Sequence, residues 1–109
     1  MEDARKSVEL DPNYAHSYVT LGEMLIVNGD VEEAFTALNK AIQLDPNIAE
    51  AYYNRAVAYE VTAITSKNYG YYELAAADLQ KVLLVTTDPD MIEAANEGLR
   101  NMQSKGYIP

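Results

Sequence analysis

The side chains that could support catalysis are few, and none lies in a catalytic pattern. His16 is the only histidine, and it falls near the expected start of a helix. None of the four serines (Ser7, Ser17, Ser66 and Ser104) stands in the Gly-x-Ser-x-Gly turn of many hydrolases. The sequence also lacks the glycine-rich loops that hold phosphates and the acidic loops that hold calcium. We therefore predict that the chain is not an enzyme and uses no metal ion or cofactor.

Composition and charge exclude further classes of function. There is no cysteine, so disulfides and cysteine-based zinc sites are ruled out. The net charge is −9 and the eight basic residues are scattered, whereas nucleic-acid binding needs clustered Lys and Arg. No apolar run approaches the length of a membrane span. The negative charge either steers a neutral or basic partner towards the chain or only keeps it soluble.

The pattern of apolar residues predicts helices that would position any binding residues. Tyr18, Leu21, Gly22 and Leu25 share one helical face between residues 14 and 27. The Asn28-Gly29 turn then makes a second helix, over about 31–44, antiparallel to the first. Gly22 and Ala34 are small enough to let the two backbones approach closely. By the same reasoning, four Asx residues are expected to be N-caps: Asn13, Asp30, Asn47 and Asp90.

A repeat of 34 residues organises the chain. Leu10-Asp11-Pro12-Asn13 returns as Leu44-Asp45-Pro46-Asn47, and Tyr18 is answered by Tyr52. A fixed period of this size is typical of stacked helix-turn-helix units, none of which can bury its apolar face alone. Such a stack favours a scaffold with a binding surface over an enzyme.

These positions resemble the tetratricopeptide repeat. The first copy reads Tyr18-x2-Leu21-Gly22-x2-Leu25, then Ala34-x3-Leu38, Ala41 and Pro46. The second reads Tyr52-x2-Arg55-Ala56-x2-Tyr59, then Ala75-x3-Leu79 and Val82, with Arg55 where the family has Leu. The resemblance implies an all-α fold, a solenoid of about six antiparallel helices wound into a right-handed superhelix.

The resemblance spans one domain of 109 residues with unequal units. We expect a half repeat over 1–12, repeats over 13–46 and 47–89, and a terminal helix over 90–109. The second repeat holds seven added residues near 60–69, roughly two helical turns, which predicts one long helix over about 48–67. A structured loop is the alternative, because Thr62, Thr65 and Ser66 are poor helix formers. Beginning inside a repeat suggests a fragment of a longer protein or an end that pairs with another copy.

In this family the first helix of each unit lines a concave groove that receives a peptide or a segment of another protein. Carried over by position, the groove residues are His16, Val19, Thr20, Glu23 and Val27, then Glu50, Tyr53, Asn54, Val57 and Glu60, then Glu93, Asn96, Glu97 and Arg100. The subclass that clamps chaperone tails uses basic residues there. Only Asn54 matches that clamp, and the groove glutamates would repel a terminal carboxylate.

Asn54 and several tyrosines could each serve either in binding a partner or in holding the fold together. Asn54 would either bridge the backbone of a peptide or bond within its own helix pair. Tyr53 would either offer a rigid contact surface or pack between repeats. The group Tyr69, Tyr71 and Tyr72, beside the insertion, would either pack the lengthened hairpin or form a second contact site.

We therefore predict a non-catalytic scaffold that binds a neutral or basic protein segment in its groove, with no nucleic acid and no membrane. The alternative is a self-assembly module that stacks into a homo-oligomer through its incomplete terminal repeats, or an accessory domain of a larger protein.

Overall fold

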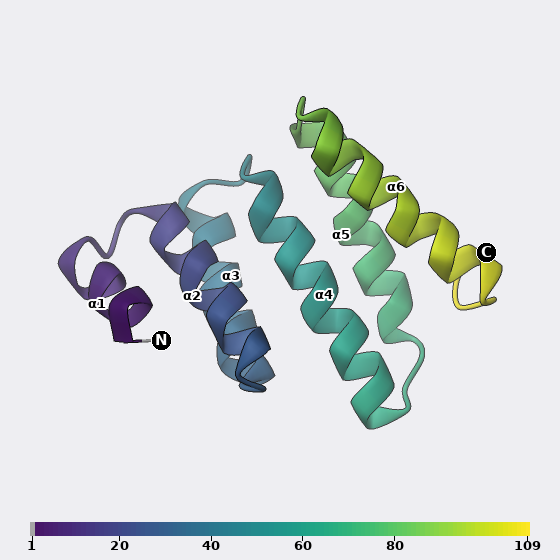
Figure 1. Ribbon diagram of the computed structural model, residues 1–109, viewed down its shortest axis with the longest axis horizontal. Coiled ribbons are helices and arrows are strands. Elements are labelled where there is room, and N and C mark those ends of the chain that lie inside the picture. The colour runs from purple at the N-terminus through teal and green to yellow at the C-terminus, as the bar shows by residue number, and fades with distance from the viewer. Residues whose placement is uncertain (1) are drawn as a thin grey trace.

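The computed structural model describes residues 2–109 and consists of six α-helices joined by short turns (Figure 1). Their bounds are α1 Glu2–Leu10, α2 Ala15–Val27, α3 Val31–Leu44, α4 Ala49–Ser66, α5 Tyr71–Val85 and α6 Pro89–Ser104. No strand occurs within this described range. The predicted all-α fold of about six helices is confirmed.

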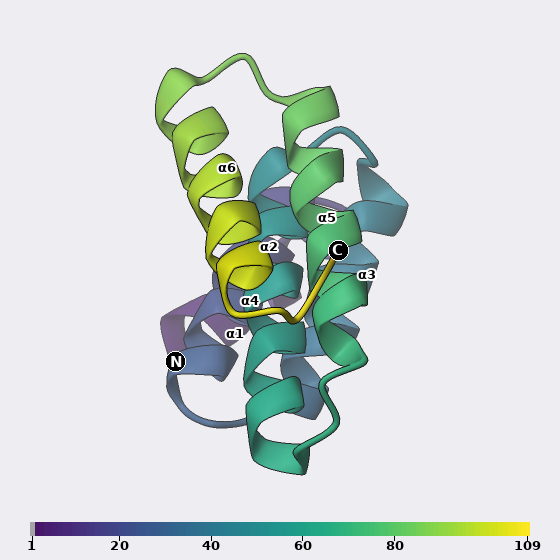
Figure 2. The same cartoon turned by 90° about the vertical axis from the view of Figure 1, so that its right-hand side faces the viewer.

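The helices form a stack of antiparallel pairs. α2 packs on α3 and α4 packs on α5, while α3 contacts α4 and α5 contacts α6, so the units follow one another along the long axis. The molecule measures 43 × 32 × 19 Å. Figure 2 shows that the segment after α6 turns back across α5. Because α2, α4 and α6 each begin a unit, they lie along the same side of the stack.

Small residues set the closeness of the helix pairs. A Cβ atom added at Gly22 would lie 2.6 Å from Cγ of Leu38, so the α2–α3 contact requires glycine. Ala34 in α3 and Ala75 in α5 are fully buried at equivalent positions of the two hairpins. The predicted close approach of the first helix pair at Gly22 and Ala34 is therefore present.

The added residues of the second unit extend α4, which continues to Ser66. The poor helix formers are accommodated because their hydroxyls bond to carbonyls one turn earlier. Thr62 Oγ1 donates to the carbonyl of Ala58 at 2.9 Å, and Thr65 Oγ1 donates to that of Val61 at 2.9 Å. The helix ends at Lys67, whose φ of 55° lies in the left-handed region. The long helix is therefore adopted, and not the loop.

Three of the four predicted N-caps are wrong, because α2, α4 and α6 begin at Ala15, Ala49 and Pro89. Asn13 and Asn47 lie in the preceding turns, and Asp90 lies inside the first turn of α6, where Asp88 caps the helix. Asp30 does occupy the cap position of α3, but its side chain makes no capping hydrogen bond and accepts from Asn28 instead.

The repeated Asp-Pro turns have another function. Asp11 accepts a hydrogen bond from the backbone N–H of Asn13, and Asp45 does the same for Asn47. The hydroxyl of Tyr18 donates to the carbonyl of Pro12 at 2.9 Å, and the Tyr52 hydroxyl donates to that of Pro46 at 2.7 Å. These side chains fix the direction in which each new helix leaves its turn, so the same device orients both α2 and α4.

An ion pair explains Arg55, the residue that departs from the family pattern. Its Nε donates to Asp78 Oδ2 at 2.9 Å and its Nη2 donates to Asp78 Oδ1 at 2.7 Å. Its Nη1 donates to Asn39 Oδ1 at 3.0 Å. The hydrogen bond to Asp78 raises the pKa of Arg55, against the opposing effect of burial. This network joins α3, α4 and α5 and holds α4 in place.

Candidate functional site

Two adjoining cavities lie along the side of the stack formed by α2, α4 and α6. The α2–α4 cavity encloses about 300 Å³ and the α4–α6 cavity about 260 Å³. Tyr53 lines both, so the two cavities adjoin at this residue, and we call them together the channel. The residues of the α2–α4 cavity are His16, Val19, Thr20, Glu23, Glu50, Tyr53, Asn54 and Met91. Those of the α4–α6 cavity are Tyr53, Ala56, Val57, Glu60, Leu79, Ala94, Glu97, Gly98 and Asn101.

The structure brings together most of the residues that the sequence predicted for the groove. All those from the first helix of each repeat line the channel except Val27, which is 82% exposed at the far end of α2. Of the four residues expected from the last helix, Glu97 lines it, and Glu93, Asn96 and Arg100 do not. Val19 is buried and belongs to the core, so it shapes the wall of the channel but offers little surface to a ligand.

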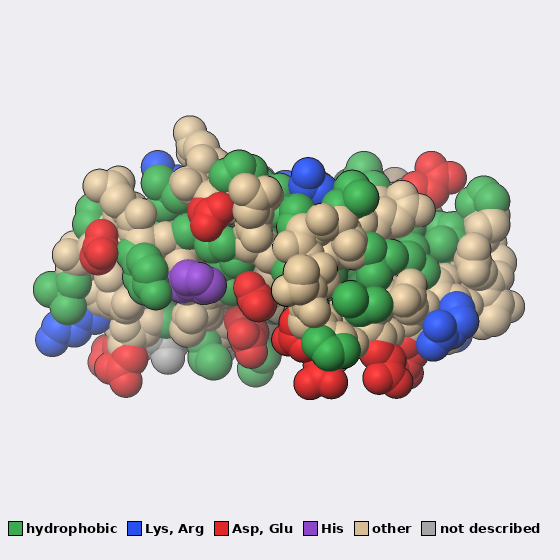
Figure 3. Space-filling view, turned by 90° about the horizontal axis from the view of Figure 1, so that it is seen from above, with side chains coloured by type: hydrophobic (Ala, Val, Ile, Leu, Met, Phe, Trp, Pro, Cys, Tyr) green, Lys and Arg blue, Asp and Glu red, His purple; other side chains and the backbone are tan. Residues whose placement is uncertain are grey.

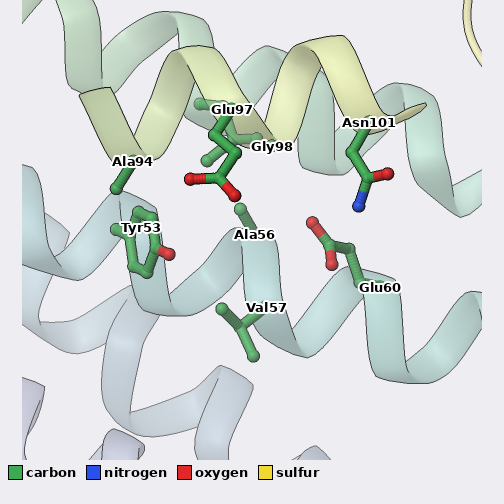
Figure 4. A pocket seen from close by; sticks show the side chains of 9 residues that line it. Tyr53, Ala56, Val57, Glu60, Ala94, Glu97, Gly98 and Asn101 are labelled. Atoms are coloured by element: carbon green, nitrogen blue, oxygen red, sulfur yellow. The ribbon is translucent and has the colours of Figure 1, made fainter. Parts of the chain in front are cut away.

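Sequence reasoning missed much of the α6 wall. Ala94, Glu97, Gly98 and Asn101 recur at a helical spacing of three and four residues. They face a stripe of α4 with the same spacing, Tyr53, Ala56, Val57 and Glu60 (Figure 4). The spacing was visible in the sequence, but the rotation of α6 about its axis was not. Small residues on both walls leave the space that forms the cavity.

The channel is acidic. Its walls carry Glu23, Glu50, Glu60 and Glu97, and no Lys or Arg is among the residues that line it. The ion pairs within residues 2–109 are Arg5–Glu33 and Arg55–Asp78, so all four of these glutamates are without an ionic partner there. Figure 3 shows acidic side chains gathered along one edge of the molecule, beside the histidine. A cationic group would therefore find several carboxylates without an ion-pair partner here.

Glu60 is the carboxylate of the channel wall whose pKa is most clearly shifted. It is half-buried, and its desolvation raises its pKa above the usual value, while nearby Lys105 partly opposes the rise. Figure 4 shows Glu60 on α4 pointing towards Asn101 on α6. The ionised form is thus more costly here than in water, and a cation entering the channel would lower that cost.

Tyr53 lines both cavities, and its neighbour Asn54 lines the α2–α4 cavity. The Tyr53 ring is half-buried and packs in part against the core of α4, α5 and α6, so it is both a packing residue and a wall of the channel. The Asn54 side chain is half-buried, and none of the side-chain hydrogen bonds found within residues 2–109 includes it. Its amide is therefore available to a ligand, and the alternative bond within the helix pair is not formed.

Tyr69, Tyr71 and Tyr72, which were considered as a second contact site, differ in burial and in stacking partner. Tyr69 stacks on Tyr72 and on Tyr107, with ring centroids 6.2 and 5.5 Å apart. Tyr72 is buried under Tyr107, with ring centroids 4.1 Å apart and rings nearly parallel. Tyr71 instead stacks on Tyr59, 6.3 Å away. Only Tyr69 is largely exposed. Tyr72 is a packing residue that holds the C-terminal segment to α5.

Within residues 2–109, no group of three or more His, Cys, Asp and Glu side chains could hold a metal ion. In that same range, none of the helices combines the length and apolar character needed to cross a membrane.

Comparison with known proteins agrees with this architecture. A family model described as the TPR repeat matches residues 22–61, from the middle of α2 into α4. The matched region contains Gly22 with its contact to Leu38 and the second Asp-Pro turn. It also contains Tyr52, whose hydroxyl donates a hydrogen bond to the carbonyl of Pro46 in that turn. No curated protein matches the chain. The family match over residues 22–61 and the stacked helical pairs together support a tetratricopeptide-repeat identity for the chain.

Proposed function

We propose that this protein binds a segment of another protein in the channel and performs no chemistry on it. Tetratricopeptide repeats generally mediate protein–protein interaction and are typically not catalytic. The observation that supports the channel as the binding surface is that α2, α4 and α6 all contribute to its walls, which carry four glutamates without an ion-pair partner within residues 2–109.

Tyr53 and Asn54 are proposed to provide the main contacts. Tyr53 is a large rigid ring, a type enriched among residues that dominate binding energy. The amide of Asn54 can accept a hydrogen bond from a peptide N–H and donate one to a peptide carbonyl. Glu23 and Glu97 would repel the C-terminal carboxylate of a partner chain. The bound segment is therefore proposed to be an internal one.

The test is affinity capture from a lysate of the source cells with two baits. One bait is the wild-type protein, and the other carries Tyr53→Ala and Asn54→Ala. A protein retained by the first and lost by the second would locate the interaction in the channel. Because Tyr53 also packs on the core, thermal unfolding must show that the double variant is folded at the temperature of the capture.

The chain offers a matched control. Asn68 and Tyr69 are the same two residue types, are exposed in the turn between α4 and α5, and do not line the channel. The variant with Asn68→Ala and Tyr69→Ala should retain the partner. Loss of the partner from this control alone would place the interaction on the tyrosine-bearing turn and contradict the channel.

Self-assembly is the alternative function, and Leu10, 77% exposed at the end of α1, is the observation that favours it. At the α1 end of the stack, Ala4 is buried against α2. Capture of copies of the protein alone, together with a mass that increases with concentration, would support assembly. A monomer at all concentrations would count against it.

A further inference from the structure

The α4 wall of the channel carries charge at both ends and apolar groups between. Glu50 and Glu60 are ten residues apart, which corresponds to about 15 Å along a helix. Tyr53 and Val57 lie between them, about 4.5 and 10.5 Å from Glu50 on the same scale. The wall therefore presents acid, then two apolar side chains, then acid.

The facing wall has the same length and adds to this pattern. On α6 the lining residues extend from Met91, in the cavity that contains Glu50, to Asn101, in the cavity that contains Glu60. Glu97 projects from α6 into the α4–α6 cavity (Figure 4). Glu23 of α2 adds a second carboxylate at the Glu50 end. Each cavity thus holds two unpaired carboxylates.

Asn54 favours an extended occupant over a helical one. Its half-buried side chain lines the α2–α4 cavity, where the amide can accept a hydrogen bond from a peptide N–H and donate one to a peptide carbonyl. A helix has already paired these backbone groups with each other, whereas an extended chain presents them unpaired.

An extended chain fixes the spacing of the groups that meet the walls. Residues rise about 3.3 Å each and alternate between two faces, so only every second side chain points into the channel. Three inward side chains at positions i, i+2 and i+4 cover about 13 Å, and flexible Lys or Arg side chains reach the remaining 2 Å. The middle one meets the apolar stretch at Tyr53 and Val57.

We propose that the segment bound in the channel is extended and carries Lys or Arg at positions i and i+4 with an apolar residue at i+2. This inference rests on the proposed function and specifies the partner that the channel selects. The cations at the two ends meet Glu50 and Glu60, and the apolar side chain packs on Tyr53.

The experiment is a selection from a random dodecapeptide library displayed on phage, with the wild-type protein as target. Selected peptides are synthesised with both ends blocked, and their affinities are measured by fluorescence anisotropy. Peptides that bind should share the pattern at i, i+2 and i+4. Moving the second basic residue from i+4 to i+5 turns it to the outer face and should weaken binding, with composition unchanged.

Charge variants of the protein test whether the α4 wall binds the basic residues at positions i and i+4. Glu50→Gln and Glu60→Gln should each weaken binding about two- to fivefold, the range of exposed to partly buried ion pairs, and less at high salt. Glu32→Gln is the matched control: it removes the same charge from an exposed site on α3 that does not line the channel, and it should leave affinity nearly unchanged.

The outcomes separate this inference from the proposed function. Peptides that need Tyr53 and Asn54 but lack the basic pair, or ignore Glu50→Gln and Glu60→Gln, would overturn the inference and leave channel binding intact. A selection in which no peptide depends on Tyr53 and Asn54 would count against both.

Discussion

Removal of the Asp78 carboxylate should sharply destabilise the protein. Asp78 accepts two hydrogen bonds from Arg55, at 2.7 and 2.9 Å, and its side chain is 7% exposed. In Asp78→Ala the Arg55 guanidinium would retain only the bond to Asn39 and the nearby ring of Tyr52, 5.7 Å away. A largely buried positive charge would then be left without its counter-ion.

The size of the loss follows from this burial. Removing one partner of a fully buried ion pair costs about 3–5 kcal/mol. The Arg55 side chain is 23% exposed, so water can compensate in part, and we expect the lower limit of about 3 kcal/mol. At about 4 °C per kcal/mol for a domain near this size, Tm should fall by about 12 °C.

Urea unfolding of four proteins measures this directly: wild type, Asp78→Ala, Arg55→Met, and Arg55→Met combined with Asp78→Leu. The combined variant replaces the pair by apolar residues and should recover most of the stability, because no charge remains buried. The exposed pair between Arg5 and Glu33 is the control, and Glu33→Ala should cost under about 1 kcal/mol. A loss below 1 kcal/mol for Asp78→Ala would refute the reasoning, since the pair would then behave as an exposed one.

Three further predictions concern other parts of the molecule. Gly22→Ala should lower the free energy of unfolding by about 1–3 kcal/mol in urea, because the new Cβ would lie 2.6 Å from Cγ of Leu38; an unchanged midpoint would show that the helix pair can separate at little cost. Tyr107→Ala should cost about 1 kcal/mol or more in thermal unfolding, since its ring stacks on Tyr72 at 4.1 Å, and an unchanged Tm would mean that the C-terminal segment adds no stability. Glu60 has a pKa raised by burial, so its contribution to stability is present below its ordinary value of 4.5 and is lost as pH rises through the raised folded-state pKa. Glu60→Gln should accordingly be more stable than wild type at pH 7 and equal to it below about pH 4.5; the same difference at both pH values would contradict the assigned cause.

The features predictable from sequence are those encoded by local periodicity. The apolar face of α2, the turn at Asn28-Gly29 and the length of α4 follow from residues close together in the chain. The residues of the channel from α2 and α4 followed from their place in the repeat, because the Asp-Pro turn and its tyrosine orient both helices alike.

What the sequence did not predict depends on contacts between distant residues. Arg55 was visible as a departure, but its partner Asp78 lies on another helix and no local pattern joins them. The rotation of α6 is set by packing against α5, where a Cβ at Gly98 would lie 2.8 Å from Leu79. The return of Tyr107 to Tyr72 involves a segment without helical period, so periodicity gave no signal for it.

The central claim is that partners bind in the channel, and site-specific photocrosslinking tests it most directly. Benzoylphenylalanine is introduced at position 53 in one protein and at position 84 in another, and each is irradiated in a lysate of the source cells. Leu84 is the control because it is 80% exposed on α5 and does not line the channel. The account predicts a crosslinked partner at position 53 and none at 84. Crosslinks at 84 without any at 53 would contradict it.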